Sequence, residues 1–290
     1  MSNLYNSKIK MIECPRDAMQ GWKTMISTEK KVSYLNSLLK VGFDTLDCGS
    51  FVSPKAIPQM ADTRDVLRQL NKKQSISKLL VIVANTRGAE EAVTFDNVTY
   101  LGFPFSISET FQQRNTNSSL QESIIRVEEI QELCIKNNKQ LVVYLSMGFG
   151  NPYGDKYNEE TLLYWADEMV RRNIGIISLA DTVGMATADQ ISFALDTLLP
   201  AYPATEFGVH LHSTPANWQQ KLEAAAKSGC KRFDGALKGI GGCPMAKDEL
   251  VGNMNTEWMI NYFQQESIMP AIDEVALAES LQMADEIFTH

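Results

Sequence analysis

Short apolar runs and longer amphipathic segments alternate along the whole chain. The apolar runs consist of consecutive Val, Ile, Leu and Phe residues rather than of alternating apolar and polar residues. Such continuous runs are typical of strands in a parallel sheet whose two faces are both covered. They predict eight strands, at residues 9–14, 45–51, 79–84, 99–105, 141–146, 176–180, 207–212 and 232–237.

The segments between these runs have the spacing of amphipathic helices. In residues 118–137 apolar side chains recur every three or four positions from Leu120 to Leu133, which places them on one helix face. Ser27 precedes another such segment at the position of a helix N-cap. The spacing predicts helices at residues 28–41, 118–137, 159–172, 187–199 and 217–227, and further helices after Asn253.

Repeats of a strand followed by a helix predict an α/β fold, the closed (β/α)8 or TIM barrel. An open doubly wound sheet is the alternative, but no Gly-x-Gly-x-x-Gly motif opens a helix after the first strand. No linker or low-complexity segment divides the chain, so we expect one catalytic domain over residues 1–290. Residues after about 253 are expected to form a helical extension that packs outside the barrel.

Composition narrows the class of protein. Hydrophobic content of 44% and charged content of 21% are typical of a soluble globular protein. A net charge of −8 without a basic run argues against nucleic acid or an anionic membrane as a partner. No apolar stretch reaches the roughly 20 residues that span a bilayer, and the N-terminus resembles no signal or transit peptide. The five cysteines include no Cys-x-x-Cys pair, which favours a cytoplasmic protein without disulfides or structural zinc.

Histidine is used sparingly, and its placement is informative. Of three histidines, His290 ends the chain, and His210 and His212 lie two residues apart in a predicted strand. Residues two apart in a strand point to the same face, so the two rings converge as a divalent metal requires. An isolated His-x-His is more often a pair of unrelated polar residues. Here the rest of the chain supplies matching ligands.

Polar side chains collect where the predicted strands end. In (β/α)8 barrels the active site lies at these carboxyl ends. The candidates there are Arg16, Asp17 and Gln20 after the first strand, Asp47 and Ser50 at the second, Asp181 and Thr182 at the sixth, the two histidines at the seventh, and Cys243 after the eighth. One rim of the barrel is therefore expected to carry the chemistry.

Three of these residues suggest a reaction. The carboxylate of Asp17 with two neutral imidazoles suits Mg²⁺ or Mn²⁺, and also Zn²⁺, Co²⁺ or Fe²⁺. Arg16 beside a metal would stabilise an enolate oxygen or a carboxylate. Cys243 lies in a Gly-Gly-Cys-Pro loop, where a thiol of tuned pKa can act as an acid or base. Taken singly, each is better explained as an ion pair, a surface arginine or an inert thiol.

Together these residues resemble the 3-hydroxy-3-methylglutaryl-CoA lyase family, within the metal-dependent lyase and Claisen-condensing TIM-barrel superfamily. The matching motifs occur in the family's order along most of the chain. They are Pro-Arg-Asp-x-x-Gln at residues 15–20, Ser-Phe-Val-Ser-Pro-Lys-x-x-Pro-Gln-Met at 50–60, Ser-Leu-x-Asp-Thr-x-Gly at 178–184, His-x-His at 210–212, Gly-x-Gly-Gly-Cys-Pro-x-Ala at 239–246 and Gly-Asn at 252–253.

The resemblance implies a role for each matching residue. Asp17, His210, His212 and Asn253 would be metal ligands, Arg16, Cys243 and Asp181 catalytic residues, and Gln20, Asp47, Ser50 and Thr182 substrate-binding residues. The chain also departs from the family pattern. It has Asp47 where many members carry glutamate, Cys14 where glycine is usual, Ser213 where aspartate is common, and a more charged loop at 245–252.

The implied reaction is a divalent-metal-dependent retro-Claisen cleavage of 3-hydroxy-3-methylglutaryl-CoA to acetoacetate and acetyl-CoA, as in leucine degradation. We expect Mg²⁺ or Mn²⁺ as the cofactor, an acyl-CoA as the substrate and a homodimer as the assembly. Asn85, Arg87 and residues 106–114 are candidate contacts for the CoA arm. The alternatives are a Claisen-condensing acyltransferase, a 4-hydroxy-2-oxo-acid aldolase and a metal-free scaffold.

Overall fold

The protein is described by a computed structural model that covers residues 9–242 and 251–289. Eight parallel strands of this described part form a closed barrel in the order β6-β5-β4-β3-β2-β1-β8-β7, with β7 pairing back to β6. Their bounds are β1 Lys10–Glu13, β2 Thr45–Ser50, β3 Lys78–Ile82, β4 Val98–Ser106, β5 Gln140–Ser146, β6 Ile176–Asp181, β7 Glu206–Ser213 and β8 Arg232–Gly235. The predicted (β/α)8 barrel is confirmed.

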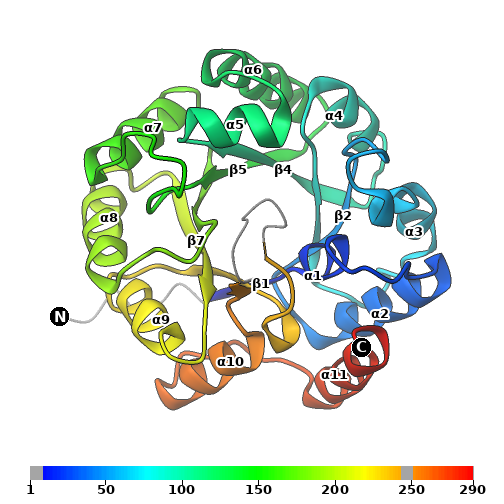
Figure 1. Ribbon diagram of the computed structural model, residues 1–290. Helices are drawn as coiled ribbons and strands as arrows, with labels where there is room; N and C mark the ends of the chain where they lie inside the picture. Colours follow the sequence, from blue (N-terminus) through cyan, green and yellow to red (C-terminus); the bar gives the residue numbers. More distant parts are fainter. Residues whose placement is uncertain (1–8, 243–250, 290) are drawn as a thin grey trace.

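Helices form an outer ring around the strands, and α1 lies inside this ring at the mouth of the barrel (Figure 1). The α-helices are α1 Pro15–Gln20, α2 Thr28–Val41, α3 Thr63–Gln69, α4 Thr86–Ala92, α5 Glu109–Thr116, α6 Leu120–Lys136, α7 Glu159–Arg171, α8 Ala188–Ala201, α9 Trp218–Lys227, α10 Thr256–Gln265 and α11 Glu274–Ile287. Short 3₁₀ turns occupy Pro58–Met60 and Leu237–Gly239. In this described part, no helix is both long enough and apolar enough to cross a membrane.

The long helices begin at side-chain caps that are visible in the sequence. The Ser27 hydroxyl accepts a hydrogen bond from the Lys30 N–H at the start of α2. Ser119 and Thr187 form capping boxes at the starts of α6 and α8. Such caps satisfy N–H groups that have no partner inside the helix. The predicted bounds of α2 are therefore those observed.

Four shorter helices, α1, α3, α4 and α5, were not predicted. Their sequences contain few apolar residues, and α5 has only Phe111. A helix of about two turns with one apolar side chain shows no 3.6-residue period. These helices form because the barrel supplies contacts that the local sequence does not encode.

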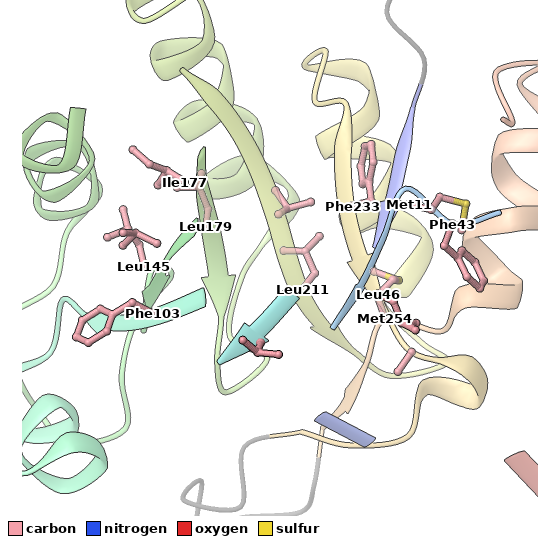
Figure 2. Packing of buried hydrophobic residues seen from close by; sticks show 14 of the residues in the cluster. Met11, Phe43, Leu46, Phe103, Leu145, Ile177, Leu179, Leu211, Phe233 and Met254 are labelled. Carbon is pink, nitrogen blue, oxygen red and sulfur yellow. The ribbon is translucent and has the colours of Figure 1, made fainter. Parts of the chain in front are cut away.

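The core has two layers, separated by the strands. Outward-facing strand residues, among them Leu145, Leu179 and Phe233, pack between the sheet and the helices (Figure 2). A smaller group fills the interior of the barrel, comprising Leu80, Ile82, Tyr100, Val142, Tyr144 and Ile176. Both strand faces are thus buried, which is why the strands read as continuous apolar runs.

The end of the chain returns to the barrel and then covers it. A ninth, two-residue strand, β9 (Gly252–Asn253), pairs antiparallel with β7. Helices α10 and α11 follow, and α11 lies against α2 (Figure 1). Ser280 of α11 donates to the Ser37 hydroxyl at 2.9 Å, and the Asp273 N–H donates to the Val41 carbonyl at 2.8 Å. The predicted helical extension is confirmed.

Glu13, at the carboxyl end of β1, connects the barrel to this last part of the chain, and we expect it to make stability depend on pH. One carboxyl oxygen accepts from the Leu237 N–H at 2.8 Å, and Thr256 Oγ1 lies 2.6 Å from the other. Burial raises the pKa of Glu13 to about 8. The folded chain therefore keeps a proton that the unfolded chain loses near pH 4.5.

The stability that Glu13 contributes is thus present at low pH and lost as pH rises toward and through about 8. Glu13→Gln cannot ionise, so its free energy of unfolding should fall less between pH 6 and pH 9 than that of the wild type. Urea unfolding of both proteins in the presence of a chelator checks this. Equal losses in the two proteins would contradict the assignment.

Candidate active site

A cavity of about 530 Å³ opens at the carboxyl ends of the strands. Its polar lining includes Arg16, Asp17, Gln20, Arg114, Asn115, Thr116, Ser146, Thr182, His210 and His212. Its apolar lining is made by Val52, Ala56, Ile57, Ile82, Ala84, Pro104, Phe111, Tyr144 and Ala180. Most of the side chains expected at this rim therefore meet in one place.

Arg16 and Asp17 are positioned by α1, which begins directly after β1 with Pro15 in its first turn. Proline suits this position because its missing N–H would have no helical partner. The two residues thus follow a barrel strand at its carboxyl end. His210 and His212 of β7 lie two residues apart and share a strand face.

Asn253 reaches the site through a long-range strand pairing. Because β9 runs antiparallel to β7, Asn253 lies opposite His212, and Gly252 lies opposite Ser213. Its amide Nδ2 donates to Asp17 Oδ2 at 2.8 Å and to the Ile240 carbonyl at 2.9 Å. The amide oxygen Oδ1 is buried and has no hydrogen-bond partner among the described residues. It is therefore available as a ligand.

Three further groups complete a candidate metal centre. Asp17, His210 and His212 each offer a ligand atom, and these atoms lie within 4.8 Å of one another. His212 Nδ1 donates to the Thr182 carbonyl at 2.9 Å, which leaves Nε2 buried and, in the described part of the chain, unpartnered. Buried polar atoms are rarely left without partners. This donor set of imidazole, carboxylate and amide oxygen fits a divalent metal ion.

The electrostatics keep Asp17 and His212 in the forms that bind metal. Burial, together with the neighbouring His210, lowers the pKa of His212 to about 4, so the ring is neutral. Burial works to raise the pKa of Asp17, but the charges of Arg16 and His210 outweigh it and hold the pKa at about 2. A neutral imidazole beside an ionised carboxylate is the required combination.

A second group of possible ligands lies beneath the first. Cys14, His210 and Asp234 also have ligand atoms within 4.8 Å of one another. Burial raises the pKa of the Cys14 thiol well above its usual range, so the thiol stays protonated. His210 Nδ1 already lies 3.2 Å from Asp234 Oδ2. The group that includes Asp17 is therefore the better metal site.

The guanidinium of Arg16 is fixed between two carboxylates at the edge of the cavity. Nε and Nη2 donate to Asp47 Oδ2 at 3.0 and 2.5 Å, and Nη1 donates to Asp17 Oδ1 at 2.9 Å. Gln20 Nε2 also donates to Asp17 Oδ1 at 2.9 Å. Asp47 therefore reaches Arg16 in spite of its short side chain. Fixed, buried donors of this kind can stabilise a developing oxyanion.

Three residues expected to contact substrate or act in catalysis, Asp47, Ser50 and Asp181, do not line this cavity, and a fourth is not described. Asp181 accepts from Lys221 Nζ at 2.6 Å and from the Ala186 N–H at 3.0 Å, and it does not line the cavity. The residues on either side of Asp181 do line the cavity, so the Asp181 carboxylate faces away from it. Asp181 is therefore not placed as the acid that was expected to contact the substrate. Ser50 lines a smaller adjacent cavity of about 240 Å³. Cys243 lies outside the described residues.

The structure brings to the site several residues that the sequence pattern did not indicate. Asp234 contacts His210 because the two are register partners in neighbouring parallel strands. Polar residues at alternate positions of the eighth strand, Arg232 and Asp234, were the available signal. Asn115 and Thr116 line the cavity from α5, a helix that the sequence pattern did not reveal.

Comparisons with known proteins agree with this geometry. The model of the family described as HMGL-like matches residues 8–284. Hydroxymethylglutaryl-CoA lyase YngG of Bacillus subtilis is 30% identical over 97% of this chain and 94% of its own length. A 3-hydroxy-3-isohexenylglutaryl-CoA/hydroxy-methylglutaryl-CoA lyase of Pseudomonas aeruginosa is 28% identical over 95% of this chain and 91% of its own. The solved structure of an HMG-CoA lyase from Acinetobacter baumannii, in complex with coenzyme A and 3-methylmalate, matches with a TM-score of 0.90 and 29% identity. The match covers 100% of this chain and 94% of that protein's chain.

Proposed function

Because the chain belongs to the HMGL-like family, we propose that it is a carbon–carbon lyase that cleaves 3-hydroxy-3-methylglutaryl-CoA to acetoacetate and acetyl-CoA. The observation that carries the proposal is the meeting of Asp17, His210 and His212 beside the buried Arg16 guanidinium in one cavity. A retro-Claisen cleavage needs both parts, since the substrate hydroxyl must lose a proton and the new enolate must be stabilised.

Asp17, His210, His212 and Asn253 would hold a divalent cation, for which we propose Mg²⁺ or Mn²⁺. Such an ion, when bound, would supply a Lewis acid that lowers the pKa of the substrate's tertiary hydroxyl. The carboxylate and amide oxygens favour such hard cations, while the two imidazoles also admit Zn²⁺ or Co²⁺.

Arg16 would donate to the thioester oxygen as negative charge develops there. Asp47 and Asp17 hold its guanidinium from two sides, so little reorientation is needed during the reaction. Cys243 would deliver the proton to the enolate carbon of acetyl-CoA. Because Asp181 accepts a hydrogen bond from Lys221, we propose that it stabilises the adjacent strand end and does not act in catalysis.

The cavity suits an acyl-CoA with a small branched acyl group. Gln20 and Thr182 line the polar side near the proposed ligands, and Val52, Ile82 and Phe111 belong to the apolar wall. The related A. baumannii protein binds coenzyme A. Because the P. aeruginosa relative is also named for an isohexenyl substrate, larger 3-substituents are a second class to test. We further propose a cytoplasmic homodimer that acts in leucine degradation.

Release of acetoacetate from 3-hydroxy-3-methylglutaryl-CoA tests the proposal directly. We expect a chelator to abolish the release and added Mg²⁺ or Mn²⁺ to restore it, because the site offers no other Lewis acid among its described side chains. Loss and recovery should follow metal content, measured by elemental analysis.

The alternatives make different predictions in the same experiment. Undiminished activity without metal would overturn the proposed mechanism. If the protein binds metal but cleaves no 3-hydroxy-3-alkylglutaryl-CoA, the proposed substrate class is wrong. Formation of a carbon–carbon bond from acetyl-CoA and a 2-oxo acid would then identify a Claisen-condensing enzyme, and cleavage of a 4-hydroxy-2-oxo acid would identify an aldolase.

A further inference from the structure

A charged layer lies inside the barrel, below the proposed ligands. Arg232 of β8 is fully buried, and its Nε, Nη1 and Nη2 atoms have no hydrogen-bond partner within the described part of the chain. Its closest carboxylate is that of Glu206, with Oε1 3.5 Å from Nη1. Its guanidinium lies 5.7 Å from the centre of the Tyr100 ring. A charge in such surroundings is costly unless other charges offset it.

The barrel is built to admit this side chain. Gly208 lies directly beside Arg232 on the neighbouring strand. A Cβ atom at Gly208 would lie 2.9 Å from the Cβ, Cγ and Cδ atoms of Arg232, closer than side chains pack. The absence of a side chain at Gly208 therefore gives Arg232 its space in the interior. The arginine points into the barrel, where it lies under the site and away from solvent.

Asp234 is the next residue above Arg232 on the same strand face. Its Oδ2 lies 3.2 Å from His210 Nδ1, while its Oδ1 is buried and has no hydrogen-bond partner among the residues described. Asp234 and Arg232 interact electrostatically. Asp234 thus lies between a buried cation below and a proposed metal ligand above.

We propose that Asp234 is a positioning residue for His210, and that Arg232 offsets the charge of Asp234 inside the barrel. This inference rests on the metal site of the proposed function. A carboxylate that accepts from Nδ1 fixes the tautomer and the plane of the ring, so that Nε2 faces Asp17 and His212. Without Arg232, the carboxylate would be an uncompensated buried anion.

The two histidines are therefore held by different means. His212 Nδ1 donates to the Thr182 carbonyl, whereas His210 Nδ1 contacts the carboxylate of Asp234. A carboxylate partner raises the basicity of the ring and strengthens its bond to metal. Loss of Asp234 should therefore weaken the bond between His210 and the metal and leave the bond between His212 and the metal unchanged.

Binding of Co²⁺ to the full-length apoprotein tests the proposal, with affinity measured by competition against a coloured chelator. Asp234→Asn should weaken Co²⁺ binding by about 10–100-fold. Arg232→Met should weaken it by a smaller factor, and Arg232→Lys should bind more tightly than Arg232→Met. Ser178→Ala is the matched control. Its buried hydroxyl also has no hydrogen-bond partner among the described residues, but it carries no charge, so its removal should leave affinity unchanged.

Thermal unfolding of each apoprotein separates positioning from general damage. If Arg232→Met does not fold, the double variant Arg232→Met/Glu206→Gln is used in its place, because it also removes the opposing charge of Glu206. Wild-type affinity in Asp234→Asn would overturn the positioning role, and wild-type affinity in the Arg232 variants would overturn the role of the arginine. A wild-type protein that binds no Co²⁺ would overturn the metal site and this inference together. Binding by the wild type with unchanged variants overturns only the inference.

Discussion

Arg16→Met is expected to lower turnover of 3-hydroxy-3-methylglutaryl-CoA by about 10²–10³, the usual cost of removing one fixed donor to an oxyanion. The guanidinium lines the cavity and is fixed by Asp47 and Asp17, so its removal takes away a donor that is already oriented. Methionine retains most of the length of the side chain. Steady-state kinetics with saturating metal measure the loss, and elemental analysis should show unchanged metal content.

Two further variants make this result specific. Arg16→Met leaves the buried carboxylate of Asp47 without its partner, so the double variant with Asp47→Asn should recover stability but not turnover. Arg68→Met removes an exposed arginine that forms a surface ion pair with Asp65 and should behave as the wild type. Full activity in Arg16→Met would rule out the oxyanion role.

His212→Ala should weaken divalent metal binding by more than about 100-fold, since loss of a group that only orients a ligand already costs about 10–100-fold. Its Nε2 is buried, unpartnered within the described chain and close to the other ligand atoms, so its removal takes away a direct ligand. Co²⁺ titration of the apoprotein, followed by visible absorption, measures the change. Turnover should fall with metal occupancy.

His290→Ala is the control, because it removes the remaining imidazole of a chain with three histidines. It should bind metal and turn over substrate as the wild type does. If His212→Ala binds metal normally, the metal centre must be sought in another group of ligands, and Cys14, His210 and Asp234 would be the next candidate.

The local pattern of the sequence was sufficient for the strands and for the long helices. The eight apolar runs became the eight barrel strands because both faces of each strand are buried. α2 and α6 were visible because a long helix repeats its apolar face several times and begins at a capping side chain. α5 has one apolar residue on its buried side, so no period could reveal it.

The sequence by itself therefore determined the barrel and the chemical types of its candidate site, including the paired histidines and the Arg16-Asp17 step after the first strand. Only the tertiary structure decided which groups meet. Strand register places Asp234 beside His210, and the antiparallel β9 places Asn253 opposite His212. Asp181 forms an ion pair with Lys221 outside the cavity. The physical reason is range: periodicity and capping act between near neighbours, whereas register and barrel closure depend on packing between residues far apart in the chain.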